Sequence, residues 1–336
     1  MRLSLIDLST LEPEGSRHQA LHHSIEIAQL AESCGFHRIW VAEHHGTRSI
    51  AGRAPEVLIA AIAANTRHIR VGSGSVLLNH YSAFKVAEVF STLEELYPGR
   101  IDLGAGRATT GRVLDVALQQ DRSKLYQSNS DEQIVELLAW LEDNFPKDHP
   151  FSSSPIARDD SRPMLHLLGS SSWSAHAAAA LGLRYVFAGF INQGQALNII
   201  QSYRSNFQAA KGPVGVASPE VILALHAVCA DTLEEARRQL APVHVMYRNL
   251  SQGILDARIP DPDKAVEALG GLPELDIYQK GSGMIPKFIG GTPESVRRQF
   301  EDIAEDFQLQ ELMIQDMMTD YTARKKSIHL LSQIID

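Results

Sequence analysis

The chain has 336 residues, of which 44% are hydrophobic and 21% are charged, a balance typical of an ordered globular protein. Its net charge of −9 would repel a nucleic-acid backbone. The two cysteines, Cys34 and Cys229, are too few for a disulfide framework and fit a reducing compartment. Because we find neither a signal-peptide pattern nor an apolar run of membrane-spanning length, we expect a soluble, cytoplasmic protein.

Strand-like segments alternate with helix-like segments along the whole chain. Short apolar runs predict strands at 2–8, 37–43, 69–78, 100–106, 164–169, 184–190, 220–230 and 311–317. Helical periodicity and capping signals predict helices at 16–35, 54–66, 82–97, 131–144, after residue 169, 193–210, from 232 onward and 320–334. Eight such units predict an α/β protein with a single (β/α)8 barrel over residues 1–336. A doubly wound sheet is the alternative, although it seldom needs eight consecutive units.

The length beyond a minimal barrel lies in two insertions, after strands 4 and 7. Residues 145–163 separate a helix from the next strand, on the face that usually serves stability. Residues 251–291 are rich in glycine and proline and follow the seventh unit. Long loops of this kind are often lids, so we expect a mobile lid at 251–291, with a solvent-exposed insertion as the alternative.

Titratable residues gather at the predicted carboxyl ends of the strands, where a barrel builds its active site. The run Glu43-His44-His45 follows an apolar strand directly and suggests a metal site, an acid/base site or a structural polar edge. Because adjacent strand residues point to opposite faces, His44 and His45 are poorly placed to bind one ion, and no H-x-H or H-E-x-x-H pattern occurs. We therefore predict no metal site.

Two stretches carry an anion-binding signal. The glycine-rich segment "GAGRATTG" places Arg107 beside an approachable backbone, and "GSSSWSAHAAAALG" places Ser170, Ser171 and Ser172 after Gly169 at the start of a helix. Hydroxyls, first-turn N–H groups and a guanidinium would converge on a phosphate monoester such as that of FMN. The alternative for the serines is an ordinary helix N-cap. Neither stretch contains the G-x-S-x-G motif of serine hydrolases.

The sequence resembles the bacterial-luciferase-like flavin monooxygenases, and it is more similar to the branch without light emission. The resemblance runs from about residue 3 to about residue 332. It rests on "WVAEHHG", "RVGSGSVLLNHYSAFKVAEVFSTLEELYPGRIDLGAGRA", "LLGSSSWSAHAAAALGLRYVFA", "FIGGTPESVRRQF" and "ELMIQDMMTDYTARKKSIHLL". It implies a (β/α)8 barrel that uses reduced FMN and dioxygen to oxidise an aldehyde or another small organic molecule.

The resemblance also assigns roles to individual residues. His44 matches the catalytic histidine of the family, and Arg107 with the turn Gly169–Ser172 matches its phosphate site. Gly74 and Ser75 match a pair that is joined by a non-prolyl cis peptide beside the flavin ring. Two positions depart from luciferase: its reactive cysteine is Gly106 here, and an acidic residue of its phosphate turn is Gly169 here. These departures weaken a luciferase activity and leave phosphate binding to backbone and serines.

Several expectations follow for activity and assembly. An unperturbed histidine titrates near 6.5, which suits His44 for proton transfer at neutral pH. We recognise no nicotinamide-binding motif in the sequence, so a separate reductase would supply the reduced flavin. The helix 54–66, with Ala60, Ala61, Ala63 and Ala64, and the helix 82–97 match the family's dimer surface and predict a homodimer. The alternatives are a deazaflavin-dependent hydride-transfer enzyme of the same superfamily and a flavin-binding protein without turnover.

Overall fold

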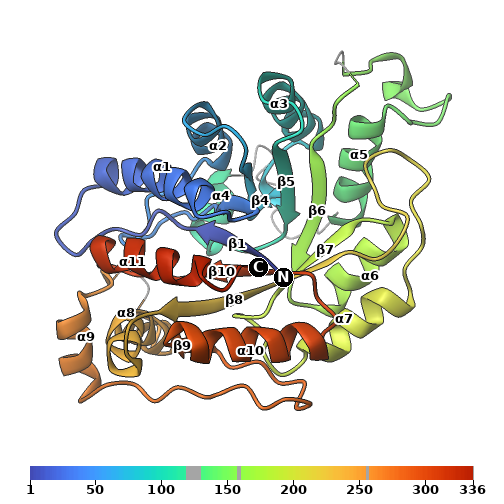
Figure 1. The fold of residues 1–336 in the computed structure, drawn as a ribbon. Coiled ribbons are helices and arrows are strands. Elements are labelled where there is room, and N and C mark those ends of the chain that lie inside the picture. The colour runs from blue at the N-terminus through green and yellow to red at the C-terminus, as the bar shows by residue number, and fades with distance from the viewer. Residues whose placement is uncertain (119–129, 157–159, 255–256, 336) are drawn as a thin grey trace.

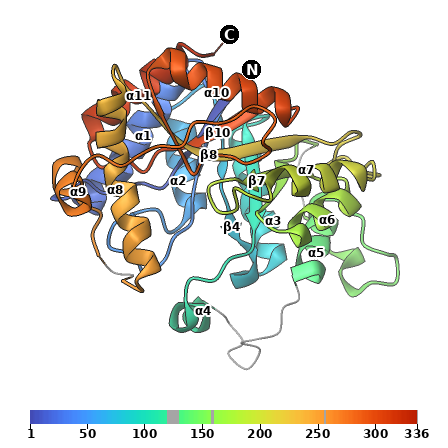
Figure 2. The ribbon, with the colours of Figure 1, turned by 90° about the horizontal axis from the view of Figure 1, so that it is seen from below.

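The computed structural model describes residues 1–118, 130–156, 160–254 and 257–335. In these ranges the chain forms a closed barrel of eight parallel strands surrounded by helices (Figure 1), which confirms the predicted (β/α)8 architecture. The strand order is β10-β1-β2-β3-β5-β6-β7-β8, and β8 pairs with β10 to close the circle. Both chain termini lie at one end of this barrel, while α4 lies at the other end (Figure 2).

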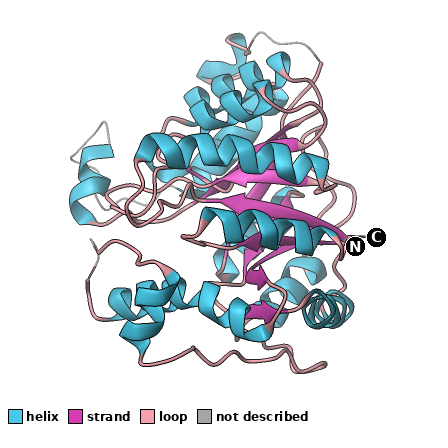
Figure 3. Ribbon diagram, turned by 60° about the vertical axis from the view of Figure 1, so that its left-hand side comes forward, coloured by secondary structure: helices cyan, strands magenta, loops and turns pink. Residues whose placement is uncertain are grey.

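The strands of the sheet are β1 (Arg2–Asp7), β2 (Arg38–Val41), β3 (Arg70–Ser73), β4 (Val76–Leu77), β5 (Ile101–Gly106), β6 (Met164–Gly169), β7 (Arg184–Ala188), β8 (Val221–Cys229), β9 (Phe288–Gly291) and β10 (Glu311–Gln315). The α-helices are α1 (Arg17–Ser33), α2 (Pro55–Ala64), α3 (Ala83–Leu96), α4 (Arg112–Leu118), α5 (Ser130–Glu142), α6 (Ser172–Leu181), α7 (Ala196–Ser205), α8 (Leu233–Ser251), α9 (Pro262–Leu269), α10 (Pro293–Asp306) and α11 (Tyr321–Ser332). Figure 3 shows the strands enclosed between layers of helices.

Alternation along each strand divides the apolar residues between two cores. On β1, Leu3 and Leu5 pack outward against the helices, whereas Ile6 points into the barrel. The interior cluster continues beyond the strands to Ile50 and Ile259, so it also underlies the loops at the carboxyl end. The barrel is therefore filled by side chains, and the ends of its strands are left to form a site.

The structure corrects the sequence prediction at two strand ends. The strand expected over 37–43 ends at Val41, so residues 42–45 belong to a loop rather than to an alternating strand. The strand expected over 69–78 is divided into β3 and β4, and a short 3₁₀ helix, η1 (Leu78–His80), follows. The peptide bond between Gly74 and Ser75 lies between the two pieces and is cis, as the resemblance implied.

Helix positions agree more closely with the prediction because their capping signals are local. Ser16 forms a capping box with Gln19, and Thr232 caps α8 through the N–H of Glu235. The prediction did not include α4, α9 or α10. The signal for α10 was present, since Thr292 caps it and Pro293 occupies its first turn.

The two insertions contain regular elements. The 3₁₀ helix η3 (Pro150–Ser153) lies within 145–163, and the segment 251–291 contains α9 and β9. Strand β9 pairs with the second half of β8, while Ala265 of α9 packs against Ala241 and Val245 of α8. Among the described residues, no helix combines the length and the apolar character needed to cross a membrane.

Candidate active site

The loop after β2 carries the Glu43-His44-His45 run and is fixed by Glu43. The Glu43 side chain is fully buried, and its Oε1 accepts hydrogen bonds from the Tyr81 hydroxyl at 2.5 Å and from His45 Nε2 at 2.6 Å. Its Oε2 accepts from the backbone N–H of Leu77 at 2.8 Å. Glu43 therefore ties the histidine loop to β4, and His45 belongs to that connection.

His44 is placed differently from its neighbours. Its backbone N–H donates to the Gly52 carbonyl at 3.0 Å, which closes the loop. Its side-chain Nδ1 is buried and meets no hydrogen-bond partner in the described part of the chain. A buried polar atom without a partner costs free energy, so such an atom at a strand end is a candidate ligand contact.

The acid strength of His44 differs from the expectation. Burial, followed by the nearby His45, lowers the pKa of His44 to about 4, although Glu43 opposes this shift. The expected titration near 6.5 is therefore wrong for the protein in this state, because sequence does not reveal how deeply a ring is buried. At neutral pH His44 is therefore a neutral imidazole, and the lowered pKa makes it a weaker base than an exposed histidine.

Gly74, Ser75 and Gly106 meet between β3 and β5. A side chain at Gly106 would collide with the hydroxyl of Ser75, and a side chain at Gly74 would collide with Ile6. Gly106 thus makes room for Ser75, and Gly74 allows the chain to pass close to Ile6. Glycine is needed at both positions for close packing around the cis peptide.

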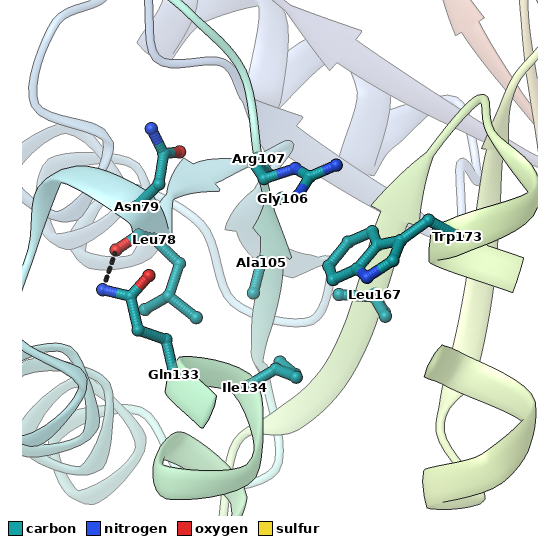
Figure 4. Close-up of a pocket in the computed structure, with 9 residues that line it drawn as sticks. All are labelled: Leu78, Asn79, Ala105, Gly106, Arg107, Gln133, Ile134, Leu167 and Trp173. Carbon is teal, nitrogen blue, oxygen red and sulfur yellow. Dashed lines mark hydrogen bonds between the residues drawn. The ribbon is translucent and has the colours of Figure 1, made fainter. Parts of the chain in front are cut away.

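Arg107 follows Gly106 at the end of β5 and reaches the start of α6. Its guanidinium carbon lies 4.3 Å from the centre of the Trp173 ring, and Figure 4 shows both side chains over the same pocket. The indole Nε1 of Trp173 donates to Asp131 Oδ1 at 2.7 Å, which fixes the ring. The pocket beneath is lined by Leu78, Asn79, Ala105, Gly106, Arg107, Gln133, Ile134, Leu167 and Trp173.

In the serine turn at the start of α6, one serine caps the helix and another is exposed. Ser171 is the N-cap, and its hydroxyl accepts from the backbone N–H of Ser174. The carbonyl of Ser170 accepts from Asn192 Nδ2 at 2.9 Å, while Ser172 is exposed. In the described structure the first helical N–H groups, at Ser172 and Trp173, have no backbone acceptor and can receive an anion.

Gly169 is required by its surroundings. A side chain at this position would collide with the buried Ser174, whose hydroxyl donates to the Ser171 carbonyl at 2.8 Å. The acidic residue that the resemblance implied for this turn would therefore not fit beside Ser174. Strands β5 and β6 are neighbours, so the predicted proximity of Arg107 to this turn is confirmed.

Of the predicted site residues, the structure groups Gly74, Ser75, Arg107 and the serine turn around β5 and β6. His44 joins them only through Glu43 and its bond to Leu77. Sequence reasoning missed Trp173, whose ring holds the arginine. A tryptophan directly after an N-cap serine in an alanine-rich helix was the available signal.

Comparison with known proteins gives matches along nearly the whole chain. The family described as luciferase-like monooxygenase matches residues 1–308. The N-acetyl-S-alkylcysteine monooxygenase of Bacillus subtilis is 36% identical, over 100% of this chain and 98% of its own. A luciferase-like monooxygenase of Escherichia coli is 32% identical over 98% and 96% of the two chains. The crystal structure of apo-MsnO8 superposes with a TM-score of 0.88 at 39% identity, covering 99% and 98% of the chains.

More distant solved structures share the fold alone. They include the oxygenating constituent of a diketocamphane monooxygenase from Pseudomonas putida in complex with FMN, with a TM-score of 0.68 at 20% identity over 99% and 97% of the two chains. They also include an F420-dependent secondary alcohol dehydrogenase, with a TM-score of 0.67 at 15% identity over 99% and 98% of the chains.

Proposed function

Because the chain belongs to the luciferase-like monooxygenase family, we propose that it uses reduced FMN and dioxygen to oxidise a small organic molecule. The observation that carries this proposal is the convergence of Arg107, Trp173 and the first turn of α6 at the neighbouring ends of β5 and β6. That arrangement offers an anion site that suits the phosphate of FMN.

The proposed phosphate contacts are the guanidinium of Arg107, the N–H groups of the first turn of α6, and the hydroxyls of Ser170 and Ser172. Ser171 would contribute mainly by capping the helix, while Gly169 keeps the turn compact. Gly74 and Ser75 would support the ring from the β3 side. When bound, reduced FMN would supply the electrons that activate dioxygen.

We assign the proton-handling role to His44. Its buried Nδ1 has no partner among the described residues, and its lowered pKa leaves the ring neutral at pH 7. A neutral imidazole accepts a proton from the reacting group and returns it later in the cycle. Glu43 and His45 would hold the loop that orients it. In the same scheme the part of the segment 251–291 that precedes β9 would act as a mobile lid over the strand ends; its residues 255–256 lie outside the described structure.

A separate reductase would deliver the reduced flavin, and the relatives suggest what to test as substrate. The name of the Bacillus relative indicates N-acetyl-S-alkylcysteines, so such thioethers should be screened beside aldehydes. The assay combines the protein, FMN, a flavin reductase and NADH under labelled dioxygen. One labelled oxygen atom in the product supports the proposal. Absence of both dioxygen-dependent product and FMN binding would contradict it.

The runner-up is hydride transfer with a deazaflavin, a chemistry represented by the F420-dependent fold neighbour. It differs in a measurable way, because it consumes no dioxygen. Reduction of a ketone by reduced deazaflavin without dioxygen uptake would favour it. A chain that binds flavin but turns over no compound in either assay would be a binding protein.

We also propose a homodimer through α2 and α3. Val57 on α2 is 67% exposed and Leu96 on α3 is 61% exposed, which is unusual for large apolar side chains. Of the alanines on α2, Ala63 packs in the barrel's own core, while Ala60, Ala61 and Ala64 are at least partly accessible. Light scattering at micromolar concentration tests the assembly, and a clean monomer would remove it.

A further inference from the structure

A second cluster of polar and aromatic side chains lies at the carboxyl end of the barrel, on the side of α8 and the segment 251–291. We call it the α8 cluster, and its members are His226, His244, Tyr247, Lys287 and Phe288. Val243 and Phe288 belong to the same interior apolar cluster as Ala42 and Ile50, which flank the His44 loop. His226 is in register with Gln315, the last residue of β10, so the α8 cluster lies at the carboxyl end of the barrel, as the candidate active site does.

His226 organises the cluster. It is 0% exposed, and burial lowers its pKa to about 4, so the ring is neutral at pH 7. Its Nδ1 lies 3.1 Å from the Gln315 carbonyl, which can only accept, so Nδ1 carries the hydrogen. Nε2 is then the acceptor for the Tyr247 hydroxyl at 3.0 Å. This chain of bonds fixes the orientation of the Tyr247 ring.

The ammonium group of Lys287 packs on the face of the Tyr247 ring. Its Nζ lies 3.6 Å from the centre of the Tyr247 ring and 5.6 Å from that of Phe288. Burial lowers the pKa of Lys287, and no carboxylate among the described residues pairs with it. A half-buried ammonium without a counter-charge is costly, which makes its position a candidate site for an anion.

His244 supplies a second group at the same place. Its ring lies 4.1 Å from that of Phe288, and its Nε2 is buried without a partner in the described structure. Burial, followed by the Lys287 charge, lowers the pKa of His244 to about 4, so this group is also neutral at pH 7. A neutral imidazole donates one hydrogen bond and adds no charge.

We propose that the α8 cluster binds the carboxylate of the organic substrate, through Lys287 Nζ and His244 Nε2. One ammonium and one neutral donor match a singly charged anion, and the rings of Tyr247 and Phe288 match the apolar atoms beside it. The substrate class is thus an organic acid whose oxidisable atom extends from this anchor toward His44. The claim that this acid is oxidised rests on the proposed function, whereas the claim that the α8 cluster binds a carboxylate does not.

The test measures binding, so it does not depend on turnover. N-acetyl-S-methylcysteine and its primary amide are titrated calorimetrically into the FMN-loaded protein, since the two probes differ only in the charge of one group. We expect the acid to bind at least about tenfold more tightly than the amide, the range of a charge-assisted hydrogen bond. Lys287→Met should bring the acid to the affinity of the amide, whereas Lys287→Arg should keep most of the preference.

Lys280→Met is the matched control, because it removes the same charge from the same segment. Lys280 pairs with Glu305 and Asp302 at the surface, so the acid should keep its preference in that variant. The proposal is overturned if acid and amide bind alike, if neither binds at millimolar concentration, or if Lys287→Met weakens both equally. The two proposals can fail separately. If Lys287→Met abolishes acid-selective binding but the protein takes up no dioxygen with reduced FMN, the proposed function is refuted and the carboxylate site stands.

Discussion

The two ends of the barrel interior differ in how their buried polar groups are satisfied. At the amino-terminal end, Arg38 Nε donates to Glu311 at 2.7 Å and Arg38 Nη1 donates to Asp102 at 2.6 Å. Asp102 also accepts from Trp40 and Arg70. Burial alone would raise the pKa of the Asp102 carboxyl, but the surrounding cations, led by Arg38, hold it below its usual value.

The carboxyl-terminal end contains both satisfied and unsatisfied groups. Arg324 donates to Asp7 Oδ1 at 2.8 Å and to Asp316 Oδ2 at 2.9 Å, but other buried atoms lack partners among the described residues. In the described residues, buried side-chain atoms without a partner include several at the strand ends and on the adjoining elements: Asp7 Oδ2, His44 Nδ1, His80 Nδ1, His244 Nε2 and Gln315 Oε1. Native interiors rarely leave such atoms unpaired. We infer two uses of buried polarity: complete networks stabilise the barrel, and unpaired atoms at the strand ends are candidate ligand contacts.

The largest expected effect is a loss of product formation after a substitution at the carboxyl-terminal end. His44→Ala should fold and bind FMN, because a side chain facing a ligand contributes little to packing. Product yield should fall by about 10² to 10⁴, the range for a lost general acid or base, while dioxygen is still consumed. His45→Ala is the control and should act mainly on stability through Glu43. Product formation is measured at matched flavin occupancy. Loss of product in His45→Ala with normal product in His44→Ala would reverse the assignment.

At the amino-terminal end, a substitution should change the stability of the protein and not its activity. Arg38→Met leaves two buried carboxylates without their shared partner and should lower the free energy of unfolding by about 3–5 kcal/mol. Arg298→Met, which removes an exposed pair with Glu294, should change it by less than about 1 kcal/mol. Urea titrations measure both. Equal, small effects would mean that the interior network adds nothing to stability.

The sequence predicts the features of the two barrel ends that depend on residues close together in the chain. Apolar runs and caps located the eight strands and most helices, and polar residues at strand ends indicated the candidate site. The pairing of Arg38 with Glu311 could not be predicted, because it joins the first residues of two strands far apart in the chain. The lowered pKa of His44 was missed for the same reason, since burial is a property of the assembled loops.

The cofactor site offers an effect of intermediate size. Arg107→Ala should weaken FMN binding by about 1.5–3 kcal/mol, the range for a hydrogen bond to a charged group. Riboflavin lacks the phosphate and should bind both proteins alike. Fluorescence quenching of the flavin gives both affinities. Equal weakening of FMN and riboflavin would indicate that the arginine supports Trp173 or the ring, and not the phosphate.

The smallest effect, taken per pH unit, concerns the acid sensitivity that buried His226 gives to the carboxyl-terminal end. The folded-state pKa of His226 is about 4, below the usual 6.5 of an unfolded chain, so the unfolded state binds more protons between these values. Stability from His226 is therefore fully present above about pH 6.5 and is lost as pH falls toward 4, by up to about 1.4 kcal/mol per pH unit. His226→Phe should be less stable at pH 7.5 but should show a shallower loss between pH 6.5 and 4.5 than the parent. His68→Gln, at an exposed position, should keep the parent slope. Chemical unfolding at several pH values measures the slopes. An unchanged slope in His226→Phe would mean that other groups govern the acid sensitivity of this end of the barrel.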